Sequence, residues 1–101
     1  AAALPPRGGR AGVLTHAGRL ALDRQDYEGA EESFLGAIAA DPASASAPAA
    51  GYHLARVYEE LGRNDEARTR LESLILEYPE SAIVPLARRM LDRLRGAVPV
   101  R

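Results

Sequence analysis

Apolar residues recur every three or four positions along most of the chain, which is the spacing of an amphipathic helix. The first two stripes comprise Leu14, Ala17, Gly18, Ala21 and Leu22, and then Ala30, Phe34, Ala37 and Ile38. Residues 54–61 and 67–75 repeat this spacing, and short polar breaks separate the stripes. The pattern predicts an all-α fold of five helices, at about 12–24, 27–40, 47–61, 64–77 and 82–95.

The chain repeats itself at an offset of 37 residues, which is the separation of His16 from His53. Arg19 falls on Arg56 at this offset, and the pattern Pro-x-Ser-Ala-x-x-Pro recurs after the second and fourth predicted helices. Periods of about 20–50 residues are typical of solenoids, in which each unit buries its apolar face on its neighbours. Each unit is predicted as helix, tight turn, helix and proline stop, and the fifth helix repeats only the first half.

The composition of the two ends sets the expected limits of the repeat domain. Residues 1–11 are rich in Ala, Pro and Gly and cannot sustain an apolar helical face, so they are predicted to be a disordered linker. The last five residues are expected to be a flexible tail. The expected limits are 12–96 for the domain, 12–42 and 48–79 for the two units, 82–96 for a capping helix and 97–101 for the tail.

The apolar stripes also predict which side chains form the core, because one face of each helix must be buried against its neighbours. We expect burial of Leu20, Ala30, Phe34, Ile38, Leu54, Ala55, Tyr58, Ala67, Leu71 and Leu74.

Small residues and closing prolines stand at regular places in both units. Gly18 and Ala55 are small in the first helix of each unit, and Pro42 and Pro79 follow the second helix. This arrangement resembles the tetratricopeptide repeat, and the resemblance covers about 85 of the 101 residues. It implies a right-handed superhelix of two helix-turn-helix units and a C-terminal capping helix.

The repeat departs from the family pattern in length, since the family unit has about 34 residues. The longer unit, with Tyr78, Pro79 and Ser81 spaced as Tyr-Pro-x-Ser, resembles bacterial envelope members of the superfamily. Those members include the Tol–Pal coordinator protein and the lipoprotein subunit of the β-barrel assembly machinery. All 13 basic residues are arginine, which a GC-rich bacterial genome explains. The localisation stays unknown, with the periplasm or cell envelope and the cytoplasm both open.

The resemblance implies that the first helix of each unit lines a concave groove that binds a peptide. Arg19, Arg56 and Arg93 recur at one position of three successive helices and predict a ladder of guanidinium groups. Such a ladder favours an acidic protein or peptide ligand. The alternative is that these arginines pair with Asp23, Glu59, Glu60 and Asp92. The expected groove residues are Thr15, Arg19, Leu22, Tyr52, His53, Arg56, Glu59, Arg89 and Arg93.

The residues of the chain offer no catalytic, metal or cofactor chemistry. There is no cysteine, and adjacent carboxylates such as Glu31 and Glu32 diverge by about 100° on a helix. His16 and His53 stand one repeat apart, at about the 10 Å spacing of packed helices, which is too far to share a metal. We therefore expect no enzyme, no catalytic residue, no metal and no cofactor.

The net charge and the hydropathy of the chain limit the classes of partner that it can bind. A formal net charge of −1 argues against nucleic acid, and no run of about 18 apolar residues is present. The last predicted helix is basic and amphipathic, but a capping role explains its apolar stripe, so we do not expect membrane contact. The predicted function is a non-enzymatic scaffold that binds a protein segment, as part of a larger bacterial protein. The alternative is a structural module that self-associates through the open ends of the array.

Overall fold

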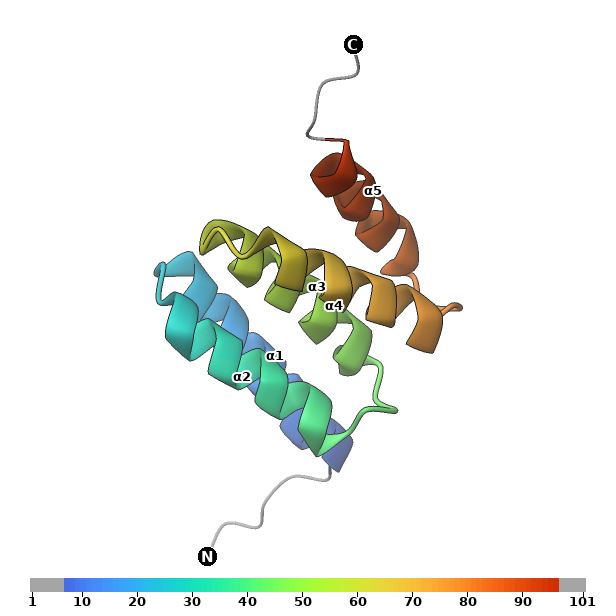
Figure 1. The fold of residues 1–101 in the computed structure, drawn as a ribbon. Coiled ribbons are helices and arrows are strands. Elements are labelled where there is room, and N and C mark those ends of the chain that lie inside the picture. The colour runs from blue at the N-terminus through green and yellow to red at the C-terminus, as the bar shows by residue number, and fades with distance from the viewer. Residues whose placement is uncertain (1–6, 97–101) are drawn as a thin grey trace, which may run out of the picture.

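The computed structural model describes residues 7–96, and in this range it contains five α-helices and no strand (Figure 1). They are α1 (Arg7–Asp23), α2 (Tyr27–Ala40), α3 (Ser46–Glu60), α4 (Asn64–Glu77) and α5 (Val84–Arg95). The all-α prediction is confirmed. The bounds of α2 and α4 are those that the periodicity predicted, and α3 and α5 differ from their predictions by one or two residues.

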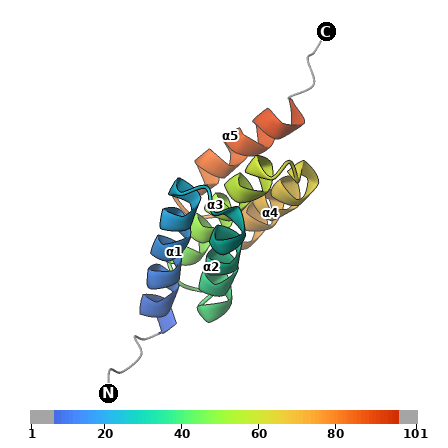
Figure 2. The ribbon, with the colours of Figure 1, turned by 90° about the vertical axis from the view of Figure 1, so that its left-hand side faces the viewer.

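The helices are arranged in two layers. In Figure 1, α1 and α3 lie behind α2 and α4, and the side view in Figure 2 separates the same two pairs. Each helix packs against the next one along the chain, and α1 also packs against α3. At one end of the stack, α5 packs on α4. The first helices of the units, α1, α3 and α5, are thus the repeated elements on which the predicted groove residues lie.

The same tight turn joins the two helices of each unit. Gln25 and Gly62, which are equivalent at the 37-residue offset, both have positive φ, of 64° and 77°. In the first turn the Asp26 N–H donates to the Ala21 carbonyl at 2.8 Å, and the equivalent bond closes the second turn at the same distance. Glycine adopts positive φ at little cost, so Gly62 follows from the turn that the repeat requires.

α1 begins at Arg7, five residues before the predicted start, so residues 7–11 are helical in place of the expected linker. Ala11 is fully buried, and a Cβ at Gly12 would lie 3.7 Å from the Ser46 hydroxyl of α3. Packing against α3 therefore extends α1 through glycines that weaken a helix by about 1 kcal/mol each. Residues 1–6 and 97–101, on which the remaining linker and tail predictions fall, lie outside the described residues.

The core lies between the two layers. Eight of the ten predicted core residues are buried, and the largest side chains with no exposure are those of Phe34, Leu54, Leu71 and Val57. Ile38 is half-buried and packs against this core. The prediction for Leu20 was wrong, because this side chain is 42% exposed on a face of α1 that no described helix covers. Its repeat equivalent, Val57, is fully buried.

The closest approach of two helices lies inside the first unit. A Cβ placed on Gly18 of α1 would lie 2.5 Å from the Phe34 ring of α2, so the ring rests directly on the helix backbone. The equivalent position in α3 is Ala55, which has no exposed surface. Small residues in the first helix of each unit thus allow the second helix to pack closely, as the resemblance implied.

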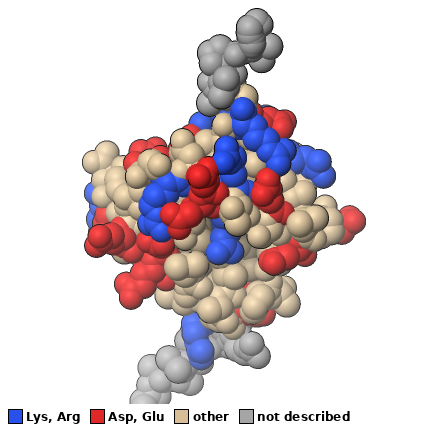
Figure 3. Space-filling view, viewed as in Figure 1, with Lys and Arg blue, Asp and Glu red and all other residues tan. Residues whose placement is uncertain are grey.

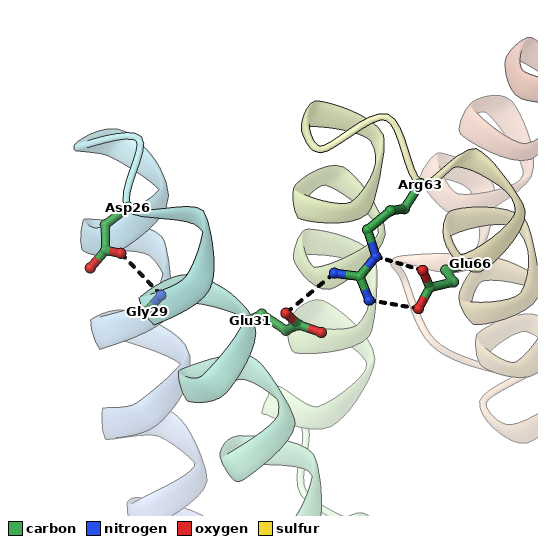
Figure 4. Close-up of polar contacts among 5 residues, drawn as sticks. All are labelled: Asp26, Gly29, Glu31, Arg63 and Glu66. Carbon is green, nitrogen blue, oxygen red and sulfur yellow. Dashed lines mark hydrogen bonds and ion pairs between the residues drawn. The ribbon is translucent and has the colours of Figure 1, made fainter.

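Arg63 connects the two units on the outer layer (Figure 4). Its guanidinium donates two hydrogen bonds of 2.5 and 2.7 Å to Glu66 of α4, and it lies 3.5 Å from Glu31 of α2. The same group sits 4.7 Å above the centre of the Tyr58 ring. Hydrogen bonding from Arg63 lowers the pKa of Glu66. Figure 4 also shows Asp26, whose carboxylate accepts a hydrogen bond from the Gly29 N–H and caps α2.

Candidate functional site

The nine predicted groove residues are distributed over α1, α3 and α5, and one of them, Thr15, is buried. Thr15 is buried, and its hydroxyl donates a 2.8 Å hydrogen bond to the Ala11 carbonyl. Leu22 is half-buried against the core. The buried Thr15 hydroxyl is therefore not available to a ligand, because helix packing has turned it inward.

The aromatic and arginine cluster lies between α1 and α3 and comprises Arg19, Tyr52, His53 and Arg56. His53 is at its centre. Its ring stacks on Phe34 with the ring centres 5.6 Å apart and an angle of 24° between the planes. Tyr52 meets the same ring edge-on, again at 5.6 Å between centres and at 64°. Two aromatic contacts therefore hold the imidazole in one orientation at the edge of the core.

The surroundings keep His53 neutral. Burial, followed by the positive charges of Arg56 and Arg19, lowers the pKa of His53 to about 4, against an opposing effect of Asp23. Nδ1 is inaccessible and has no hydrogen-bond partner. A proton there would be a buried donor without an acceptor, which proteins rarely tolerate, so we assign the ring proton to Nε2. At pH 7 His53 is thus a neutral hydrogen-bond donor beside two cations.

Arg19 and Arg56 are the two unpaired guanidinium groups of this cluster. Both are exposed, and neither forms an ion pair or a hydrogen bond with another residue in the range 7–96. They lie on α1 and α3, one repeat apart, and both act on the His53 ring. Exposed guanidinium groups without a carboxylate partner retain their full capacity to bind an anion.

Arg93 differs from the other two arginines of the predicted ladder. Its guanidinium donates hydrogen bonds to both carboxylate oxygens of Glu59, one of them at 3.1 Å between Nη2 and Oε1. These bonds raise the pKa of Arg93. The alternative, in which the arginines pair with nearby carboxylates, is therefore correct for Arg93 and Glu59. The pair joins α5 to α3 and leaves two free arginines in place of three.

A shallow pocket of about 390 Å³ lies between α3 and α5. Three of its lining residues, Tyr52, Arg89 and Arg93, were predicted as groove residues, and Leu86 and Met90 were not. Met90 stands one repeat after His53 and belongs to the apolar stripe of α5, for which the favoured prediction was the buried face of a capping helix. Met90 lies one helical turn after Leu86, and this spacing was the sequence feature that could have indicated that the stripe also lines the pocket.

The opposite face of the molecule carries charges of both signs. Acidic and basic side chains are interspersed over the outer layer, which is the face seen in Figure 3. Within residues 7–96 no helix is both long and apolar enough to cross a bilayer. No group of three or more His, Asp or Glu side chains in the same range is arranged to hold a metal ion. The aromatic and arginine cluster is therefore the candidate site.

The fold defines a helical-repeat protein of two helix-turn-helix units followed by a fifth helix. The sequence model of the tetratricopeptide repeat family matches residues 21–91, which is more than half of the chain. The chain therefore belongs to the tetratricopeptide repeat family. Searches of curated proteins and of solved structures found no match. Repeats of this family mediate interactions between proteins and are typically not catalytic.

Proposed function

We propose that this chain is a scaffold that binds an acidic segment of another protein along α1 and α3. The observation that carries the proposal is the pair Arg19 and Arg56, which are free of carboxylate partners within residues 7–96 and flank the neutral donor His53. The two guanidinium groups and the imidazole N–H are then donors, which suits the carboxylates of an acidic peptide, and they outnumber the one carboxylate, that of Asp23, whose charge also acts on the ring.

The arrangement favours an extended peptide over a single small anion. The two arginines stand on successive repeats, so one peptide contacts both only if it runs across α1 and α3. The pocket between α3 and α5, with Tyr52 at its edge, continues this surface and offers apolar area to a neighbouring residue of the peptide. Tyrosine at such an edge supplies contact area at low entropic cost.

The test uses a fluorescently labelled peptide of alternating glutamate and glycine, with a glutamine–glycine peptide as the uncharged control. Anisotropy should show binding of the glutamate peptide alone. Affinity should fall as the Debye length shortens from about 10 Å at 0.1 M salt to about 3 Å at 1 M. Arg56→Ala should weaken binding by at least about tenfold, because one charge-assisted hydrogen bond contributes about 1.5–3 kcal/mol. Arg56→Lys should recover part of this loss, since an ammonium group cannot form the bidentate fork.

Arg68→Ala is the matched control, since it removes an arginine from α4 that is already paired with Asp65. It should leave the affinity unchanged. The proposal is wrong if Arg56→Ala binds the glutamate peptide as well as the unmodified chain does. Equal binding of the glutamate and glutamine peptides would also exclude it.

Self-association is the second candidate, and the face of α1 that no described helix covers favours it. Val13 and Leu20 are 61% and 42% exposed, while their repeat equivalents Ala50 and Val57 are fully buried in α3. Sedimentation over a concentration series tests it: a dimer that Leu20→Glu dissociates is expected, and a monomer at high concentration contradicts it.

A further inference from the structure

The pocket between α3 and α5 differs in chemistry from the arginine pair beside it. Its lining combines the apolar side chains of Leu86 and Met90 with the ring of Tyr52. Met90 is buried and forms the floor of the pocket, whereas Leu86 is 39% exposed and forms part of its rim. A ligand side chain that removes this apolar surface from water is bound by the hydrophobic effect. We name this surface the anchor pocket, and it suits an aliphatic or aromatic side chain.

The anchor pocket does not repeat the carboxylate site of Arg19 and Arg56. Arg93 stands at their position in α5, but it is already held by Glu59. A ligand carboxylate at this point would meet the negative charge of Glu59 as well as the guanidinium, so the two effects largely cancel. The third place of the predicted ladder is therefore better filled by an apolar residue than by a third acidic one.

Arg89 gives the rim of the anchor pocket a positive charge. It lines the pocket, is exposed and forms no ion pair with a residue in the range 7–96. It stands at the repeat position of Tyr52, one helical turn before the ladder position of α5. The rim thus favours an acidic segment over a basic one, as the free arginines of α1 and α3 do.

The spacing of the helices sets the register of a bound segment. Packed helices lie about 8–10 Å apart, and Arg19 and Arg56 stand at one repeat position of α1 and α3, which pack on each other. A polyproline II segment rises about 3.1 Å per residue with three residues per turn, so every third side chain lies on one face, about 9 Å apart. Acidic residues three positions apart therefore reach both arginines, and the next residue at this spacing reaches the anchor pocket.

We propose that the acidic segment binds in extended form with two acidic residues and one large apolar residue at spacings of three, the apolar residue standing at one end. The acidic residues pair with Arg19 and Arg56, and the apolar residue occupies the anchor pocket. This order and spacing are additional to the proposed function, on which they rest. The apolar residue comes first or last in the sequence of the partner according to the direction in which the segment runs across the helices.

Residues 77–83 have the same spacing of two glutamates and one apolar residue, but they are not free to bind a second copy. They are folded into turns, in which the Ser81 N–H donates to the Tyr78 carbonyl at 3.0 Å. Ile83, the apolar residue of the series, packs against the core of its own chain. This segment is therefore neither extended nor able to fill the anchor pocket of another molecule.

A helix of a second copy does not present the required carboxylates either. A helix rises about 1.5 Å per residue, so its carboxylates must stand about seven positions apart to reach both arginines. Within the described helices only Asp65 and Glu72 have this spacing, and both are paired with arginines of their own chain. The occupant is therefore an acidic segment of a different protein.

The probes are labelled peptides with proline spacers, because proline favours the polyproline II conformation before binding. The expected ligands are Glu-Pro-Pro-Glu-Pro-Pro-Leu and the reversed sequence Leu-Pro-Pro-Glu-Pro-Pro-Glu, each with a neutral label and an amidated C-terminus. The isomer Glu-Pro-Pro-Leu-Pro-Pro-Glu has the same composition and charge but places leucine against Arg56. At least one expected ligand should bind the 101-residue chain at least about tenfold more tightly than this isomer, which corresponds to about 1.4 kcal/mol.

Leu86→Ser tests the anchor pocket itself. Replacing the leucine of the better ligand by alanine should weaken binding to the unmodified chain about fivefold, and most of this difference should disappear in Leu86→Ser. Leu76→Ser is the matched control, because it removes an exposed leucine of α4 that does not line the anchor pocket, and it should retain the difference. Both leucines are exposed, so the fold should persist, and circular dichroism checks this.

The outcomes separate this inference from the proposed function. If the glutamate peptides bind and the terminal leucine adds no affinity, or Leu86→Ser retains its effect, the anchor is wrong and the proposed function stands. If the glutamate peptides bind no better than their glutamine forms, both are wrong. A dimer at the assay concentration that Leu86→Ser dissociates also overturns the anchor, in favour of a second copy.

Discussion

α3 and α5 occupy the same place in successive repeats, yet they carry different residues on the side that faces the outer layer. Leu54 and Leu91 are both buried, but the next residue is a fully buried alanine in α3 and an exposed aspartate in α5. α3 lies among α1, α2 and α4, whereas α5 packs on α4. Residue type at a repeat position thus follows the number of helices that cover it.

α3 and α5 also differ in the pairing of their equivalent arginines, Arg56 and Arg93. Arg56 is free within the described residues, whereas its equivalent Arg93 is held by Glu59 of α3. The repeat places both at one helical position, but within the described residues only Arg93 meets a carboxylate, which the first helix of the preceding unit, α3, presents. One sequence pattern therefore leaves an unpaired guanidinium in α3, among the described residues, and produces an ion pair between α5 and α3.

The largest effect is expected where a second helix packs closely on a first one, as α2 does on α1 through Phe34. No described helix covers the equivalent side of α5. Phe34→Ala should lower the free energy of unfolding by about 3–5 kcal/mol, because a fully buried ring is lost and a cavity is left. Leu91→Ala in α5 should cost less, about 2 kcal/mol, since fewer helices surround it. Urea denaturation measures both. A loss below about 1 kcal/mol for Phe34→Ala would contradict the described core.

Equivalent positions should respond differently to the same residue. Gly18→Ala should cost about 1–3 kcal/mol, because the new Cβ meets the Phe34 ring at 2.5 Å. Asp92→Ala should change stability by less than about 0.5 kcal/mol, since Asp92 is exposed. Thermal denaturation of the two variants compares them. Equal losses of stability in the two variants would show that α1 at Gly18 and α5 at Asp92 are packed alike.

His53, whose equivalent in α5 is the non-titrating Met90, predicts a pH effect in α3 that α5 lacks at this position. The pKa of His53 is lowered to about 4 from 6.5, so the unfolded chain binds the proton more tightly. Stability is therefore complete above pH 6.5 and is lost as the pH falls toward 4. The loss should be on the order of 1 kcal/mol, after allowance for solvent screening.

His53→Phe serves as the control, because it retains the stack on Phe34 and removes the titration. The difference in unfolding free energy between the two proteins, followed from pH 7 to pH 4, isolates the contribution of His53 from that of the carboxylates. Parallel pH profiles would rule out the low pKa.

The smallest effect is expected at the ion pair between α3 and α5. Glu59→Gln should lower the free energy of unfolding by less than about 1 kcal/mol, because Arg93 is largely exposed. The difference from the unmodified chain should disappear in 1 M salt. Hydrogen exchange should speed up in α5 and remain unchanged in α3. An effect that persists in high salt would indicate a packing role for Glu59.

Much of the fold followed from residue spacing. The period of 3.6 predicted all five helices, and the 37-residue offset predicted two units and a half. Gly18 and Ala55 indicated close packing of each helix pair, and the structure confirms this at Gly18. For the same reason, Arg19 was placed on the first helix of one unit, and His53 and Arg56 on the first helix of the next. These features are readable because each depends on neighbours within one repeat.

Other features depended on helices far along the chain or on their absence. Leu20 has the periodicity of a core residue, but no described helix covers it, and Thr15 lies inward because of how α1 is oriented. The start of α1 at Arg7 reflects packing that outweighs the low helix propensity of glycine. The local spacing of the residues predicts none of these outcomes.

By itself, the sequence determined the helices, the turns, the repeat and the positions of the arginines, because these are set by periodicity and backbone preference over short distances. The tertiary structure alone decided which side chains are covered, that Arg93 is paired while Arg56 is free, and that His53 is neutral. Burial and charge pairing are properties of neighbours in space, and the neighbours of one helix come from every other part of the chain.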